Sequence, residues 1–172
     1  KGFYMNFQKI KKHLLIIMLF GVVACEDVNN KSKVVNNGQK SNELVQLEVY
    51  KSPTCGCCRK WVNYVNSNGF SSTVHHPSNL QHLKLDRGIA PKYQSCHTAI
   101  SKDGYVFEGH VPVDVMKRFL KEKPTDAIGL SVPGMPVGSP GMEMRNRRDD
   151  YDVLLLRKDG TAKVYQEIRQ TL

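Results

Sequence analysis

Four cysteines in this sequence have a spacing that could do chemistry. Cys55, Cys57 and Cys58 lie within one Cys-Gly-Cys-Cys run, and Cys96 stands next to a histidine further along the chain. Adjacent Cys57 and Cys58 cannot easily bridge each other, because disulfide geometry would strain the backbone between them. Thiolates are soft ligands that select Cu(I), zinc or iron–sulfur clusters. The spacing therefore indicates a soft-metal site, or a redox pair of Cys55 and Cys58 with one further thiol.

Two plainer interpretations of the same cysteines are weaker. A structural zinc site would use Cys96 as its fourth ligand, but zinc usually takes well-separated cysteine pairs, and here three cysteines come from one turn. A set of inert buried thiols is disfavoured, because a single turn is too narrow to bury three side chains. A redox pair would leave Cys57 without a role, whereas a soft ion gains a ligand from it.

One histidine and two methionines extend the candidate ligand set. His110 ends the strand expected opposite Cys96, so a hairpin would bring its imidazole toward the cysteines. Neighbours on a strand point to opposite faces, so we expect Cys96 rather than His97 to meet the cluster. His97 stays open between a ligand and a buried, hydrogen-bonded side chain. Met135 and Met142 lie in a glycine- and proline-rich segment, where their soft thioethers suit Cu(I); the alternative is ordinary loop packing over the site.

The segments that must position these residues alternate between strand and helix patterns. The first helix runs from the cysteines to a stop at Asn68-Gly69, and the remaining elements are expected as strands at 44–50, 70–75, 96–101, 105–109, 153–156 and 162–168 and helices at 80–85 and 113–121. This β-α-β then β-β-α order is the thioredoxin-like arrangement. The expected fold is α/β, with a mixed sheet, flanking helices and a C-terminal hairpin. The cysteines then start the first helix, where its dipole favours thiolates.

Three local features are also expected from the pattern. Ser52 or Thr54 caps the first helix. The second helix turns leucines inward, namely Leu80, Leu83 and Leu85. Residues 127–141, with three prolines among four glycines, form a structured loop rather than a strand or a helix.

The N-terminal segment resembles an export signal. Three lysines precede the apolar run 14–23, which has the length of a signal-peptide core and is too short for a comfortable membrane span. The run ends in Val22-Val23-Ala24-Cys25, which resembles a bacterial lipobox. We therefore expect a lipoprotein-type signal peptide at 1–24 with lipid attachment at Cys25, a flexible tether at 25–43 and one folded domain at 44–172. The expected location is the periplasm or cell envelope, anchored to a membrane; the alternative is an ordinary secretory signal.

The charge pattern argues against nucleic acid as a partner. The chain has 25 basic and 16 acidic residues, and four of the lysines lie in residues 1–24, which contain no acidic residue. The remaining lysines and arginines are scattered and form no dense run with aromatic residues between them. A mildly basic solvated surface explains this composition.

These motifs together resemble a family of bacterial metal-binding proteins of formerly unknown function that includes the copper-resistance protein CopG. The resemblance spans roughly residues 46–145, and it is carried by residues 53–58 with Trp61, 69–70, 95–99, 104–105, 108–112, 129–136 and 138–143. It implies a thioredoxin-like fold that binds copper in the cell envelope and takes part in copper resistance. It also implies copper ligands at Cys55, Cys57, Cys58, Cys96 and His110, with the methionine loop as an accessory.

The expected function is therefore copper binding in resistance or homeostasis. Four thiolates and an imidazole exceed what one Cu(I) needs, so bridging thiolates could hold several copper ions that cycle between Cu(I) and Cu(II). A metal-binding protein is favoured over an enzyme, and a copper export or copper-handling protein is the expected partner. The alternatives are a thiol–disulfide oxidoreductase using Cys55 and Cys58, and a chaperone that passes on one weakly held Cu(I).

Overall fold

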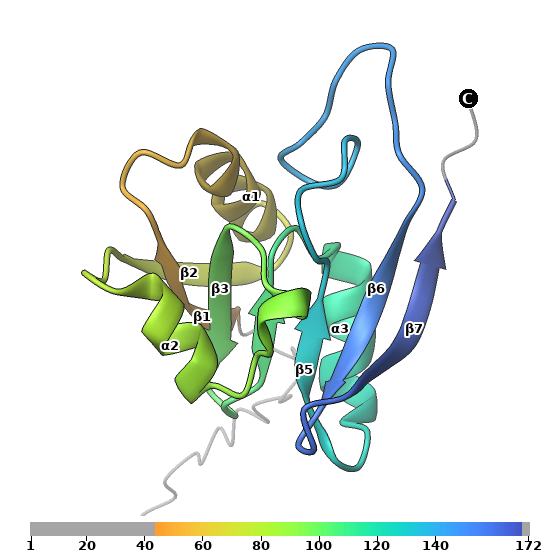
Figure 1. Ribbon diagram of the computed structural model, residues 1–172. Helices are drawn as coiled ribbons and strands as arrows, with labels where there is room; N and C mark the ends of the chain where they lie inside the picture. The colour runs from red at the N-terminus through yellow and green to blue at the C-terminus, as the bar shows by residue number, and fades with distance from the viewer. Residues whose placement is uncertain (1–43, 170–172) are drawn as a thin grey trace, which may run out of the picture. The chain divides into compact units, whose positions relative to one another are not determined.

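A computed structural model describes residues 44–169 of the chain. Its strands are β1 (Val45–Lys51), β2 (Phe70–His75), β3 (His97–Ser101), β4 (Val106–Glu108), β5 (Ala127–Ser131), β6 (Tyr151–Arg157) and β7 (Ala162–Ile168). Its helices are α1 (Gly56–Asn66), α2 (Leu80–Asp86) and α3 (Val113–Glu122), with a short 3-10 helix at Pro91–Tyr93. Figure 1 shows the strands side by side in one sheet, with α2 in front of it and α3 behind it.

The sheet is mixed, and its strand order is β2-β1-β3-β4-β5-β6-β7. β1 pairs with β2 in parallel, and β4 pairs with β5 in parallel. The other neighbours are antiparallel, including the consecutive strands β6 and β7. The predicted α/β class with a mixed sheet and flanking helices is therefore confirmed. The order places the end of β1 beside the start of β3, and that is where the cysteines meet.

The main core lies between the sheet and the faces of α1 and α3. Trp61 and Val65 of α1 are fully buried, as their helical spacing predicts, and so are Met116 and Phe119 of α3. Phe119 also meets Phe107 of β4 edge to face, with the ring centroids 5.8 Å apart. Burying such side chains contributes roughly 1.5–3 kcal/mol each, so this core fixes both helices against the sheet.

The predicted loop at 127–141 is wrong over its first five residues, because these form strand β5. The strand lies between β4 and β6, and its backbone passes very close to β4. A Cβ on Gly129 would lie 1.8 Å from the carbonyl oxygen of Val106, so only glycine fits there. The glycine that suggested a loop is thus the residue that allows the two strands to pair.

The predicted inward face of the second helix is wrong for Leu85. Leu85 is 49% exposed and Leu80 and Leu83 are only partly buried, whereas Lys84 is 3% exposed. The hydrophobic pattern assigned Lys84 to the surface, because a lysine is rarely buried unless its charge has a partner. Its ammonium group has one, as the site below shows.

The N-terminal predictions concern residues outside the described range. The signal segment 1–24, the tether 25–43 and the lipid-attachment residue Cys25 all precede residue 44. Within residues 44–169, no helix combines the length and the apolar character needed to cross a membrane.

Candidate metal centre

The first helix is capped by one of the cysteines. Cys55 has an extended backbone, and its sulfur accepts a hydrogen bond from the backbone N–H of Cys58 at 3.3 Å. The expectation that Ser52 or Thr54 caps the helix is therefore wrong; their hydroxyls bond to each other at 3.1 Å. A sulfur at the N-cap receives both the free N–H groups and the positive end of the helix dipole, which favours an anionic ligand there.

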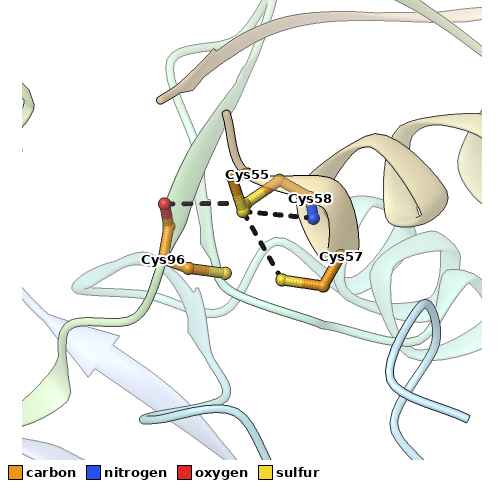
Figure 2. Close-up of side chains that lie close together, drawn as sticks. All are labelled: Cys55, Cys57, Cys58 and Cys96. Atoms are coloured by element: carbon orange, nitrogen blue, oxygen red, sulfur yellow. Dashed lines mark hydrogen bonds between the residues drawn. A yellow bond between two sulfur atoms is a disulfide. The ribbon is translucent and has the colours of Figure 1, made fainter. Parts of the chain in front are cut away.

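The four predicted cysteines converge on one point. Cys55 and Cys58 form a disulfide, while Cys57 and Cys96 are free thiols. The Cys57 sulfur lies 3.4 Å from that of Cys55, and the Cys58 sulfur lies 3.8 Å from the carbonyl oxygen of Cys96. All four sulfurs lie within 4.8 Å of one another. Figure 2 shows Cys96 facing the three cysteines at the start of α1.

An imidazole nitrogen lies against Cys96 from the segment that follows β4. The Nε2 atom of His110 lies 3.1 Å from the Cys96 sulfur. The other ring nitrogen, Nδ1, donates a hydrogen bond to the carbonyl oxygen of Pro140 at 2.7 Å. Since a carbonyl only accepts, Nδ1 carries the proton and Nε2 presents its lone pair to Cys96. A backbone carbonyl that fixes the tautomer in this way is the usual support of a metal-binding histidine.

The Cys96 thiol is held neutral in the metal-free protein. Burial, together with the nearby Cys57, raises the pKa of Cys96 to about 12. The thiol hydrogen can then point to the Nε2 lone pair of His110. Burial also lowers the pKa of His110, with the hydrogen bond to Pro140 opposing that shift. A soft cation would replace the hydrogen between this sulfur and this nitrogen.

His97 enters the site as well, contrary to the expectation that only one of the two neighbours would do so. Its Nδ1 lies 3.3 Å from the Cys96 sulfur, and its fully buried ring packs on Trp61 with the centroids 4.5 Å apart. Alternation along a strand does not apply here, because Cys96 precedes β3 and only His97 belongs to it. Burial lowers the pKa of His97 well below its ordinary value, and the nearby His110 and Lys84 lower it further.

A buried ion pair beneath the site was not predicted. Glu108 is fully buried, and its carboxylate accepts hydrogen bonds from the ammonium of Lys84, the hydroxyl of Thr98 at 2.6 Å and the backbone N–H of Ser95 at 2.6 Å. The Ser95 hydroxyl in turn donates to the carbonyl oxygen of Gly134. These bonds fix the backbone on both sides of Cys96. The only sequence signal was an acidic residue inside an otherwise apolar strand.

The two predicted methionines lie in different places. Met142 lines a groove together with Cys57, Arg59 and Met144. Met135 is 52% exposed and lines a separate groove beside Tyr151. Met142 therefore shares a groove with one of the cysteines, Cys57, whereas the groove of Met135 is lined by no cysteine.

Gly141 explains why Met142 lies against the first helix. The backbone at Gly141 has φ +85°, and a Cβ there would lie 2.8 Å from the nitrogen of Trp61 and 2.9 Å from the oxygen of Cys57. Only glycine allows the loop to approach α1 so closely. The same approach places Pro140, the hydrogen-bond partner of His110, beside the site.

Similarity to known proteins covers most of the described residues. The profile of a family described as "Protein of unknown function, DUF411" matches residues 93–142. A solved structure of copper resistance protein CopG, form 1, is 38% identical, covers 74% of this chain and 100% of its own, and has a TM-score of 0.69. The chain belongs to the DUF411 family, which includes CopG. A form 2 structure of CopG is 39% identical at the same coverage, with a TM-score of 0.68. No curated protein matches the chain.

The donor atoms of this DUF411 protein fit a soft metal ion. Two donor groups share the Cys96 sulfur: one adds the sulfurs of Cys55, Cys57 and Cys58, and the other adds ring nitrogens of His97 and His110. Cys57 and Cys96 are free thiols, and reduction of the disulfide would add two further thiols. Sulfur and imidazole donors suit Cu(I) and zinc, whereas Mg²⁺ and Ca²⁺ prefer oxygen. No carboxylate belongs to either donor group found in residues 44–169.

Proposed function

We propose that this protein binds copper in the cell envelope and serves copper resistance or homeostasis. The observation that carries the proposal is the convergence of four cysteine sulfurs within 4.8 Å of one another, with the Nε2 lone pair of His110 lying 3.1 Å from one of them, the Cys96 sulfur. Similarity to copper resistance protein CopG supports copper as the ion among the soft metals that these donors fit. The strand order β2-β1-β3-β4 with α1 and α3 on the core face supports a thioredoxin-like fold extended by β5, β6 and β7.

The ligands proposed for Cu(I) are Cys57, Cys96 and His110 in the disulfide form, joined by Cys55 and Cys58 after reduction. Five donors exceed the needs of one Cu(I). Thiolate sulfurs can bridge metals, so the reduced site is proposed to hold several copper ions in one small cluster. Mixed sulfur and nitrogen ligands would allow such a cluster to cycle between Cu(I) and Cu(II), in support of a copper export or copper-handling partner.

Met142 is proposed as an accessory thioether ligand, because it shares a groove with Cys57. A thioether stays available where thiols are oxidised, which suits an oxidising compartment. Met135 would reach the cluster only after the loop that carries it moved, so its role as a ligand is secondary in this proposal.

The envelope location rests on the N-terminal sequence. A lipoprotein-type signal at 1–24, lipid attachment at Cys25 and a tether at 25–43 would place the domain at a membrane face. Mass spectrometry of the membrane fraction tests this part, since a lipid-modified Cys25 is expected at the mature N-terminus and an unmodified one contradicts the anchor.

Anaerobic copper titration tests the main proposal. Full-length protein in detergent, reduced and then freed of reductant, is titrated with Cu(I) in competition with a chelator of known affinity. More than one tightly bound copper per chain is expected. The control replaces Cys55, Cys57 and Cys58 with serine. Equal copper uptake by the control and the native protein would contradict the proposal, and a single weakly held ion would indicate a copper chaperone instead.

A thiol–disulfide oxidoreductase is the second candidate, because the structure contains a disulfide at the Cys-x-x-Cys spacing of Cys55 and Cys58. The N–H of Cys58 bonds to the sulfur of Cys55, as expected of a helix start that stabilises a thiolate. Rapid turnover of a model disulfide, lost in the variant Cys55→Ser, would favour this candidate. Copper binding with negligible turnover excludes it.

A further inference from the structure

The proposed function leaves His97 without a role, although its ring lies inside the site. Among buried side-chain nitrogen and oxygen atoms of residues 44–169, only His97 Nε2 and Ser72 Oγ lack a hydrogen-bond partner. The His97 side chain is fully buried, so its Nε2 atom is not exposed to bulk solvent. Burying a polar atom without a hydrogen-bond partner costs free energy. A favourable interaction at the other ring nitrogen, Nδ1, is therefore expected to offset that cost.

The unpartnered atom determines where the ring hydrogen lies. An imidazole carries hydrogen on Nδ1, on Nε2, or on both. Two of these three forms would bury an N–H group with no acceptor, and buried orphan N–H groups are rare in proteins. Only the form with hydrogen on Nδ1 avoids this. In that form Nε2 of His97 is a bare acceptor, and Nδ1–H points to the Cys96 sulfur 3.3 Å away.

The two histidines beside Cys96 therefore present opposite groups to its sulfur. His110 gives its Nδ1 hydrogen to Pro140 and turns a lone pair toward Cys96. His97 has no such acceptor at its far nitrogen and turns a hydrogen toward the same sulfur. The far nitrogen of a metal-binding histidine almost always donates a hydrogen bond, a condition that His110 meets and His97 does not.

We propose that His97 is not a metal ligand but a positioning residue that donates an Nδ1–H hydrogen bond to the Cys96 sulfur. The His97 ring packs on Trp61, and this packing keeps Nδ1–H directed at the sulfur. Trp61 is itself held in place by the hydrogen bond from its indole N–H to the carbonyl of Val111 at 3.0 Å. The hydrogen-bond part stands on the contacts alone, whereas its effect on copper rests on the proposed function.

A hydrogen bond of this kind tunes a copper–thiolate centre. It draws electron density from the sulfur, so the sulfur donates less electron density to Cu(II) than it would without the hydrogen bond. Hydrogen bonds to ligating sulfurs are a known control of the reduction potential in blue-copper and iron–sulfur sites. His97 is therefore expected to raise the Cu(II)/Cu(I) potential and favour Cu(I).

Nitrogen NMR of the copper-free protein tests the hydrogen bond directly. Full-length copper-free protein in its Cys55–Cys58 disulfide form, labelled with ¹⁵N in histidine, is expected to show His97 with hydrogen on Nδ1 and a bare Nε2, with His110 in the same tautomer. A His97 ring with hydrogen on Nε2 would overturn the proposal. This measurement needs neither copper nor a variant, so it decides the hydrogen bond even if copper binding fails.

Two substitutions then separate a hydrogen-bond donor from a ligand. His97→Leu removes the donor, whereas His97→Asn restores an N–H near the position of Nδ1. With Cu(II), the sulfur-to-copper charge-transfer band is expected to shift to lower energy in His97→Leu and to stay near the native position in His97→Asn. The number of copper ions bound is expected to be unchanged in both variants.

Each result has a distinct consequence. Loss of a copper ion together with a nitrogen hyperfine coupling in His97→Leu would make His97 a ligand and overturn the proposal. An unshifted band at unchanged copper content would overturn it too. A native protein that binds no copper would instead contradict the proposed function, and the NMR result would still decide the hydrogen bond.

Discussion

The Cys96 sulfur and the Nε2 atom of His110 lie 3.1 Å apart, and the far nitrogen of that imidazole is tied to Pro140. Three separate segments meet at this contact: the residue before β3, the segment that follows β4, and the glycine-rich loop. The hydrogen between sulfur and nitrogen is the one that a metal ion has to displace. Metal binding at this site is therefore expected to release a proton.

Copper binding is expected to release the Cys96 proton near neutral pH. Burial and the neighbouring Cys57 raise the pKa of Cys96 to about 12, so the thiol is protonated at pH 6–8. Copper affinity should rise about tenfold per pH unit for each proton displaced. Chelator competition at pH 6, 7 and 8 measures the slope. Cys96→Ser should reduce the slope by about one proton, and an unchanged slope would contradict the role of Cys96.

The same shift predicts how the stability of the metal-free protein depends on pH. The folded state keeps the Cys96 proton up to a pH near 12, whereas an unfolded thiol loses it near 9.0. The unfolded state therefore binds fewer protons above pH 9, and stability falls as the pH rises through that range. Urea unfolding of the reduced protein at pH 8 and pH 10 checks this, with Cys96→Ser expected to lose the contribution.

Reduction of the disulfide is expected to raise the copper capacity. In the disulfide form, Cys55 and Cys58 are covalently paired and only Cys57 and Cys96 offer thiols. Two electrons and two protons convert the disulfide into two further thiols. Metal analysis after Cu(I) loading, with and without prior treatment by a dithiol reductant, measures the difference. The double variant Cys55→Ser with Cys58→Ser should bind the same amount under both conditions. An equal capacity of the native protein in both forms would contradict this prediction.

The buried Lys84–Glu108 pair should be costly to break from one side. Lys84→Met leaves the Glu108 carboxylate buried without its cation, and such a change typically costs about 3–5 kcal/mol. The free energy of unfolding from urea titration of the copper-free protein measures the loss. Glu108→Gln added to Lys84→Met should recover part of it, because no charge is then buried. Lys121→Met, at an exposed position of α3, should stay within about 0.5 kcal/mol of the native protein.

The sequence alone predicted the structural role of a residue correctly where that role depends on the residue's own segment. The buried face of Trp61 and Val65 follows from helical spacing, and the cysteine run marks the start of that helix. The sequence did not predict the role of a residue where that role depends on a partner far away in the chain. Lys84 is buried because Glu108 lies opposite it, and Gly129 belongs to a strand because Val106 passes beside it. Neither relationship leaves a periodic signal.

His97 shows the same limit at the level of one atom. Its neighbour Cys96 indicated the site, but the assignment of His97 depends on which nitrogen has a partner. That requires the positions of Trp61, His110 and the surrounding strands. A sequence pattern cannot supply those positions.

The two methionines provide a matched test of the accessory ligand. Met142 shares a groove with Cys57, and Gly141 fixes the loop there by its close approach to α1. Met135 lies on a separate groove, 52% exposed. Met142→Leu keeps the size of the side chain but removes the thioether, so Cu(I) affinity should fall roughly 3- to 10-fold, about 1 kcal/mol. Met135→Leu should leave it unchanged. Chelator competition under anaerobic conditions measures both, and an equal effect of the two substitutions would show that the groove beside Cys57 gives Met142 no special role.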